Sequence, residues 1–118
     1  MIDMSVIGNS VCLASNGSGS SAVKVMEQGQ VSNTSTYMTA TFDSSIASYD
    51  FVEVHMFRAD ADIGYAVVKV PTSSATFYIT GGEYTYTMIL TPTTIRCSNY
   101  SGTYVNLYVD VFAYVKAI

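Results

Sequence analysis

The fold class is decided by the stretch Phe77-Tyr78-Ile79-Thr80-Gly81-Gly82-Glu83-Tyr84-Thr85-Tyr86, in which two alternating segments flank a pair of glycines. A Gly-Gly pair between alternating segments is typical of a two-residue β-turn. That turn places Ile79 opposite Tyr84 and Phe77 opposite Tyr86. Opposite residues share a face of a sheet, so one face is expected to carry Phe77, Ile79, Tyr84, Tyr86 and Met88. The stretch therefore predicts an antiparallel β-hairpin with its threonines on the other face.

The same two-residue alternation continues on both sides of the hairpin and extends along most of the chain. Helical periodicity is almost absent, and short turns rich in Ser, Gly or Pro separate the apolar segments. The expected strands are Ala22–Met26, Tyr37–Phe42, Phe51–Arg58, Tyr65–Val70, Phe77–Thr80, Glu83–Tyr86, Thr94–Cys97 and Thr103–Lys116. Between them, Gln28–Ser35 is expected to be a polar loop and Ala59–Gly64 a turn. We expect one all-β domain, an antiparallel β-sandwich or jelly roll of about eight strands, with a small barrel as the second choice.

The N-terminal part differs in composition from the rest of the chain. Residues 1–21 contain a short apolar segment and the Gly/Ser-rich stretch Asn16–Ser21, and we expect an arm and a flexible loop there. The sandwich domain is expected at 22–118. The chain begins without a basic residue before its apolar stretch, so no signal peptide is expected and synthesis in a cytoplasm is favoured. The two cysteines, Cys12 and Cys97, lie in apolar, strand-like surroundings typical of buried thiols.

Composition and charge exclude several classes of protein. The chain has 118 residues, of which 12% are charged and 49% hydrophobic, so it is neither a disordered chain nor a coiled coil. Five Lys and Arg against nine Asp and Glu give a net charge of −4, so we expect no nucleic-acid partner. No segment approaches the roughly 20 apolar residues that span a bilayer, so we expect no membrane partner.

Few residues offer catalytic or metal-binding chemistry. His55, the one histidine, is expected on the strand face that also carries Phe51, Glu53 and Phe57, where Glu53 would orient it as a base. No Ser or Cys lies in a recognisable nucleophile motif, so we expect no enzymatic activity and no catalytic residue. The segment Asp60–Gly64 has the acids of a calcium-loop start without the later ligands of that motif. We therefore expect no metal and no cofactor.

The last predicted strand carries the candidate site. Its apolar face is expected to point to the core and consists of Val105, Leu107, Val109, Val111, Ala113 and Val115. Its outward face consists of Tyr104, Asn106, Tyr108, Asp110, Phe112 and Tyr114. An outward row of aromatic rings indicates a contact between subunits, since Tyr buries a large area at low entropy cost and keeps a polar tip. Two alternatives are a platform for a sugar ligand, with Asn106 and Asp110 supplying hydrogen bonds, and ordinary cross-strand pairing on a solvated sheet.

Three segments carry a resemblance to a known class of proteins, namely Tyr49–Phe57, Gly81–Tyr86 and Tyr108–Phe112. Together with the low charge and the abundance of Ser, Thr and Tyr, they resemble the small β-sandwich modules of tailed-phage virion proteins, such as tail-fibre, baseplate and head-decoration components. The resemblance extends over about residues 36–115 and contains no diagnostic motif, so it assigns no catalytic or binding residue. It implies a non-enzymatic structural or host-attachment protein of the virion, assembled in the bacterial cytoplasm as a homo-oligomer, with a trimer favoured.

The partners implied by the resemblance are other copies of the chain, other virion proteins and a host surface glycan. Residues 1–21 would then be an arm that docks to a larger virion protein. One alternative is a carbohydrate-binding module, which would be a monomer with exposed tyrosines, although the absence of Trp argues against it. The other is a small phage protein that binds a host signalling molecule or defence protein in a polar pocket between subunits.

Overall fold

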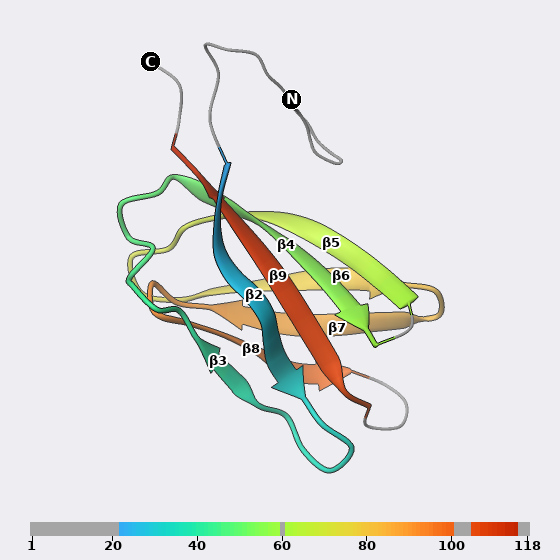
Figure 1. The fold of residues 1–118 in the computed structure, drawn as a ribbon. Coiled ribbons are helices and arrows are strands. Elements are labelled where there is room, and N and C mark those ends of the chain that lie inside the picture. Colours follow the sequence, from blue (N-terminus) through green and yellow to red (C-terminus); the bar gives the residue numbers. More distant parts are fainter. Residues whose placement is uncertain (1–21, 60, 101–104, 116–118) are drawn as a thin grey trace.

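The computed structural model describes residues 22–59, 61–100 and 105–115, which form a β-sandwich of two four-stranded antiparallel sheets (Figure 1). One sheet has the strand order β2-β9-β4-β5 and the other β3-β8-β7-β6. The strands are β2 (Ala22–Ser32), β3 (Thr39–Thr41), β4 (Phe51–Arg58), β5 (Ala61–Lys69), β6 (Ala75–Gly81), β7 (Tyr84–Leu90), β8 (Thr94–Tyr100) and β9 (Leu107–Tyr114). The predicted single-domain, all-β sandwich is therefore confirmed, and the described residues contain no helix.

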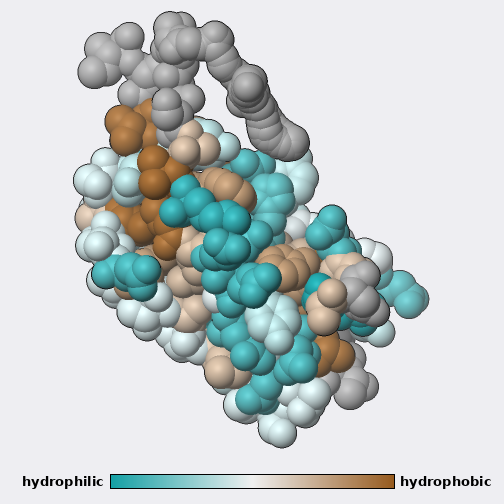
Figure 2. Space-filling view, viewed as in Figure 1, coloured by the Kyte–Doolittle hydropathy of each residue, from teal (hydrophilic) through white to brown (hydrophobic). Residues whose placement is uncertain are grey.

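Local hairpins and long-range pairings both contribute to the two sheets. The β4–β5 hairpin lies in the first sheet, and β6, β7 and β8 follow one another in the second. Strand β9 is inserted between β2 and β4, both of which precede it by a long stretch of chain. The first sheet faces the viewer in Figures 1 and 2, with β9 near its centre. This insertion makes the C-terminal strand a central element of the first sheet.

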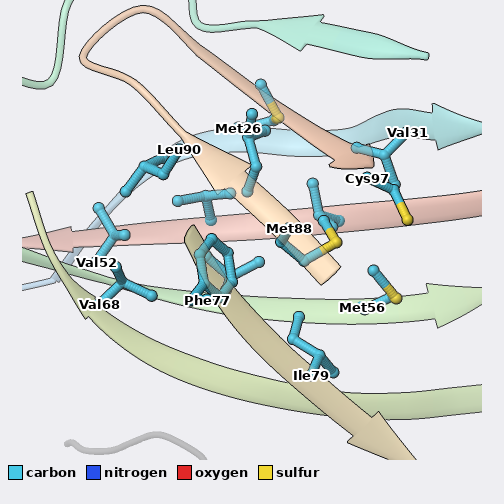
Figure 3. Packing of buried hydrophobic residues seen from close by; sticks show 14 of the residues in the cluster. Met26, Val31, Val52, Met56, Val68, Phe77, Ile79, Met88, Leu90 and Cys97 are labelled. Carbon is cyan, nitrogen blue, oxygen red and sulfur yellow. The ribbon is translucent and has the colours of Figure 1, made fainter. Parts of the chain in front are cut away.

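The core lies between the sheets and is filled by the inward residues of the alternating strands (Figure 3). On β9, the fully buried Leu107, Val109, Val111 and Ala113 confirm the predicted apolar face over that length. Val115, predicted on the same face, lies beyond the end of β9 and is 51% exposed. The other strands contribute aliphatic and sulfur-containing side chains, among them Met26, Val52, Val54, Met56, Ile79, Met88, Leu90, Ile95 and Cys97. Each fully buried aliphatic side chain stabilises the fold by about 1.5–3 kcal/mol.

The predicted hairpin is present, but its turn lies one residue further along the chain. Gly81 pairs with Tyr84 inside the strands, so the turn residues are Gly82 and Glu83. Gly82 has a φ of 62°, a left-handed value that glycine adopts without strain. Gly81 is required for a different reason, because a Cβ atom there would lie 2.5 Å from the carbonyl oxygen of Ile63 on β5. The first glycine therefore permits close packing of β6 on β5, and the second makes the turn.

The corrected register leaves the predicted faces of the hairpin almost unchanged. Ile79 lies opposite Tyr86, and Phe77 opposite Met88, so each partner differs from the predicted one by two residues. A shift of two residues keeps every side chain on its side of the sheet, and these four side chains are buried as expected. Tyr84, expected with them, lies at the hairpin end and is 41% exposed.

Strand β2 corrects the polar loop that the sequence predicts at Gln28–Ser35. The strand continues to Ser32, because three irregularities in its pairing with β9 accommodate extra residues. At one of them, Gln28 has a φ of 52°. Val31 and Ser32 are fully buried at the end of the strand. The polar residues of this segment thus lie on a bulged strand at the edge of the sheet. Bulges in an edge strand commonly hinder its pairing with another sheet.

Most of the other strands also differ in length from the prediction: β6, β7 and β8 are longer than expected, and β9 covers Leu107–Tyr114 of the expected Thr103–Lys116. The expected strand Tyr37–Phe42 is reduced to β3, whereas β5 begins at Ala61, inside the predicted turn. Strand β5 carries a bulge between the partners of Met56 and Phe57. A Cβ atom on Gly64 would lie 2.8 Å from the carbonyl oxygen of Thr80, so glycine lets β5 and β6 approach closely there. The arm predicted for residues 1–21, including Cys12, lies outside the described residues.

Candidate functional site

The outer face of the β2-β9-β4-β5 sheet carries two adjacent rows of half-buried side chains. The row on β9 consists of Tyr108, Asp110, Phe112 and Tyr114, and the row on β4 of Phe51, Glu53, His55 and Phe57. Antiparallel pairing sets the rows side by side, with Phe51 opposite Tyr114 at one end and Phe57 opposite Tyr108 at the other. We call these two rows, together with Lys24 on β2 and Tyr65 on β5, the aromatic face. Figure 2 shows this side of the molecule, where hydrophilic and hydrophobic side chains are interspersed.

Aromatic rings stack across β4 and β9 at both ends of the aromatic face. The ring centroids of Phe51 and Tyr114 are 4.8 Å apart, and their planes differ by 8°. The centroids of Phe57 and Tyr108 are 5.8 Å apart, with planes that differ by 28°. Stacked pairs of this kind contribute about 0.5–1.5 kcal/mol beyond the area that they bury. The two stacks therefore restrict the movement of these four rings on the surface of the sheet.

The middle of the aromatic face is centred on His55. Its ring stacks on that of Tyr65 at 5.5 Å and meets the ring of Phe112 edge-on at 5.7 Å. On the far side of Phe112, the Lys24 ammonium lies 5.5 Å from the ring centroid. These contacts connect all four strands of the sheet, from β5 through β4 and β9 to β2.

Glu53 joins the two rows through its carboxylate. The hydroxyl of Tyr114 donates to Oε1 at 3.1 Å, and His55 Nε2 lies 3.4 Å from Oε2. The hydrogen bond from His55 is the largest influence on the pKa of Glu53 and outweighs its partial burial, so that this pKa is lowered. Burial and the neighbouring Glu53 raise the pKa of Tyr114. The expected contact between Glu53 and His55 is therefore present, and Tyr114 holds the carboxylate from the other side.

Asp110 fixes the bulged edge strand β2 to β9. Its Oδ1 accepts a hydrogen bond from the backbone N–H of Gln28 at 2.8 Å, and its Oδ2 lies 4.0 Å from Lys24 Nζ. The hydrogen bond supports the left-handed conformation of Gln28. The sequence suggests Asp110 as a hydrogen-bonding group for a ligand, whereas the structure gives its carboxylate partners within the chain.

The structure brings most of the predicted site residues together. Tyr108, Asp110, Phe112 and Tyr114 point outward on β9, as expected. Asn106 precedes β9 and is exposed, and its Oδ1 accepts a hydrogen bond from Gln30 Nε2 at 3.3 Å. Tyr104 lies outside the described residues.

Sequence reasoning missed that the row on β4 is the neighbour of the row on β9. The alternation of both strands is visible in the sequence, and so is the shared face of Phe51, Glu53, His55 and Phe57. The pairing of the two strands joins distant segments, however, and no local pattern specifies it. The only available signal is that both outward rows are unusually aromatic.

The acidic segment after β4 does not supply a metal site in the described part of the chain. Asp62 is exposed on β5, and Asp60 lies outside the described residues. Among the described residues, no group of three or more His, Cys, Asp or Glu side chains is arranged to hold a metal ion.

A shallow pocket between the ends of the β4–β5 and β6–β7 hairpins is lined by Arg58, Ala61, Asp62, Ile63, Gly81, Gly82, Glu83, Tyr84 and Tyr86. The described residues also include no helix long and apolar enough to cross a membrane.

Comparison with known proteins identifies no relative of this chain. No protein-family model, no curated protein and no solved structure matches it.

Proposed function

We propose that the chain is a non-enzymatic, homo-oligomeric structural or host-attachment module of a tailed-phage virion, and that its copies contact each other through the aromatic face. The observation that supports this proposal is the pair of ring stacks across β4 and β9 on the side of the sheet that faces away from the core. Half-buried aromatic side chains on a surface are the usual anchors of protein interfaces.

The aromatic face is prepared for burial because its groups already have partners within the chain. Stacked rings have lost much of their rotational freedom, so a partner that covers them causes little further loss of entropy. Glu53 is bonded to Tyr114 and His55, and Asp110 to Gln28. Covering charges that are already hydrogen-bonded carries a smaller desolvation penalty than covering free ones. These features favour a second protein surface as the partner.

The orientation of the rings favours a protein over a sugar. A sugar platform needs open ring faces, on which the apolar side of the sugar can lie. The nearly parallel rings of Phe51 and Tyr114 cover one face of each other, and those of Phe57 and Tyr108 are stacked in a similar way. The ring edges and the Tyr108 hydroxyl are left for a partner, whereas the Tyr114 hydroxyl is bonded to Glu53, and such groups suit mixed polar and apolar contacts.

The assignment to a phage virion is supported by the resemblance of Tyr49–Phe57, Gly81–Tyr86 and Tyr108–Phe112 to virion β-sandwich modules. Sparse charge also suits a chain that is largely covered in a symmetric assembly. In this proposal the chain assembles in the bacterial cytoplasm, with a trimer favoured, and residues 1–21 dock to another virion protein.

The mass of the full chain in solution tests the proposal. Size-exclusion chromatography with light scattering is expected to give a defined multiple of 12.7 kDa, and Tyr108→Asp is expected to lower that mass. The matched control is Tyr78→Asp, because Tyr78 is 60% exposed on the other sheet, and it should keep the wild-type mass. Circular dichroism verifies that both variants are folded, and Tyr108→Ser replaces the charged variant if that one unfolds. A monomeric wild-type chain, or a folded Tyr108 variant of unchanged mass, would contradict the proposal.

A further inference from the structure

Strand β5 forms an edge of the first sheet, and its outward side chains are unusually exposed. It pairs with β4 and with no other described strand. Tyr65 and Val67 are 62% and 60% exposed, although both are large hydrophobic residues. A long, regular and apolar edge strand is a template for pairing with another chain.

Two of the other three edge strands, β2 and β3, carry features that hinder such pairing, whereas the edge strand β6 is regular and has polar threonines on both sides of Tyr78 on its outward side. Strand β2 has three irregularities and the left-handed Gln28, and β3 is only three residues long. On β5, the single bulge lies at its beginning, and the pairing with β4 is regular from Gly64 to Lys69. Pro71 follows shortly after the end of the strand. The regular edge of β5 thus extends from Tyr65 to Lys69.

The backbone of β5 shows which groups this edge offers. The N–H of Val70 donates to the carbonyl oxygen of Asp50, so Val70 directs its N–H toward the β4 side. In an antiparallel pair, successive residues direct their N–H and C=O groups alternately toward and away from the neighbouring strand. The backbone groups of Tyr65, Val67 and Lys69 therefore point to the open edge. The same three residues carry the outward side chains.

We propose that β5 pairs with β5 of a second copy in antiparallel orientation, with Val67 opposite Val67. In this register Val67 lies on the two-fold axis, and Tyr65 of each copy lies opposite Lys69 of the other. It is the only register in which the N–H and C=O groups of all three residues form hydrogen bonds between the copies. The side chains are complementary in that register. Val67 meets its own copy, and the Lys69 stem and ammonium lie over the Tyr65 ring.

Charge complementarity supports the same register. Asp62 lies opposite Phe57 and so on the outward face, one step beyond Tyr65 along β5. Lys69 of one copy would thus be diagonal to Asp62 of the second copy, a separation of about 7–8 Å that a long side chain can span. By symmetry the contact forms twice. The pairing would extend the first sheet, and with it the aromatic face, across two copies.

Of the aromatic face, this edge contact involves only Tyr65, so the edge contact and the contact through the rows on β4 and β9 can form independently. Tyr108 is on β9 and Val67 on the edge strand β5, so one substitution addresses one contact. A chain whose mass changes with Tyr108→Asp but not with a Val67 variant retains the proposed function and loses the edge contact. A chain whose mass changes with a Val67 variant but not with Tyr108→Asp retains the edge contact and loses the proposed function.

Disulfide cross-linking of the full chain tests the register. In the proposed pair the two Val67 Cα atoms are about 5.5 Å apart, a distance that a disulfide spans. Val67→Cys is therefore expected to give a covalent dimer on mild oxidation. Tyr65→Cys is not expected to do so, since its two copies would be roughly 13 Å apart along the strand. Tyr78→Cys, with the same exposure as Val67 on the other sheet, measures random collisions. Cross-linking of Val67→Cys no greater than that of Tyr78→Cys would overturn the proposal.

A charge at the symmetry axis tests the contact without cross-linking. Val67→Lys would set two ammonium groups opposite each other and is expected to abolish the concentration-dependent association that β5 provides. Its own fold should be unaffected, because Val67 is largely exposed and its backbone groups are not used by β4. An unchanged concentration dependence of the mass in this variant would also overturn the edge contact.

Discussion

The two sheets of this molecule share one core but present different outer faces. The first sheet carries the aromatic face, whereas the outward residues of β6 and β7 are mainly threonines, namely Thr76, Thr80, Thr85 and Thr87, with Tyr78 as an exposed ring. Threonine suits a solvated sheet through its branched side chain and hydroxyl group, so the second face meets the requirements of strand formation alone. The rings of the first face exceed those requirements. The two outer faces therefore differ in chemistry, and the proposed contact between copies assigns a role to the first one.

The largest loss of stability is expected from a charge on the buried side of β9, where core and outer surface differ most. Val109→Asp places an unpaired carboxylate in the core and is expected to abolish soluble folding, with a loss of several kcal/mol. The matched variant Thr87→Asp, on the outward side of β7, is expected to fold. Soluble yield and a thermal melt by circular dichroism measure both. A Val109→Asp protein with the wild-type melting temperature would mean that the faces of β9 are assigned the wrong way round.

Removing one aromatic ring from each outer face tests whether the two faces contribute differently to the free energy of unfolding. Phe51→Ala removes the stack on Tyr114 and is expected to lower the free energy of unfolding by about 1–2 kcal/mol. Tyr78→Ala is expected to change it by no more than about 0.5 kcal/mol, because that ring is largely exposed. Urea unfolding at one fixed protein concentration measures both, since any assembly makes stability depend on concentration. Equal losses would contradict the distinction between the faces.

A smaller effect is expected from acid, acting through Glu53 on the aromatic face. The pKa of Glu53 is lowered in the folded chain, chiefly by the hydrogen bond from His55, so ionised Glu53 stabilises the fold above the unfolded pKa of 4.5. That contribution is lost as the pH falls through the lower folded value. Glu53→Gln should therefore flatten the decline in the free energy of unfolding below about pH 4.5. Glu83→Gln, at the exposed β6–β7 turn, is the control and should leave the decline as it is in the wild-type chain.

The sequence predicts those features that depend on neighbouring residues. The alternation on β4 and β9 specifies which side chains are buried, and the strand Phe51–Arg58 has the predicted ends. The sequence misplaces the turn after Thr80, because Gly81 serves the contact with Ile63 on another strand. The extent of β2 was missed for a similar reason, since the hydrogen bond of Gln28 to Asp110 comes from the far end of the chain. Features fixed by distant partners are not encoded in any local pattern.

The aromatic face illustrates the same limit. The sequence identifies its β9 row as outward, and it identifies the shared face of Glu53 and His55 on β4. It does not show that Tyr114 stacks on Phe51 or bonds to Glu53, because the β4–β9 pairing is a property of the whole topology. The assignment of the face as a contact between copies stays a prediction.

The sulfur atoms of the core have a consequence for the lifetime of the protein in oxidising surroundings. Met26, Met56, Met88 and Cys97 are buried, and burial raises the pKa of the Cys97 thiol to about 11. Oxidants therefore reach these groups only when the sandwich opens. A methionine sulfoxide formed in that moment is polar and disrupts core packing, so a brief opening leaves damage that lasts until the sulfoxide is reduced. How long the protein survives is then governed by how often the two sheets separate.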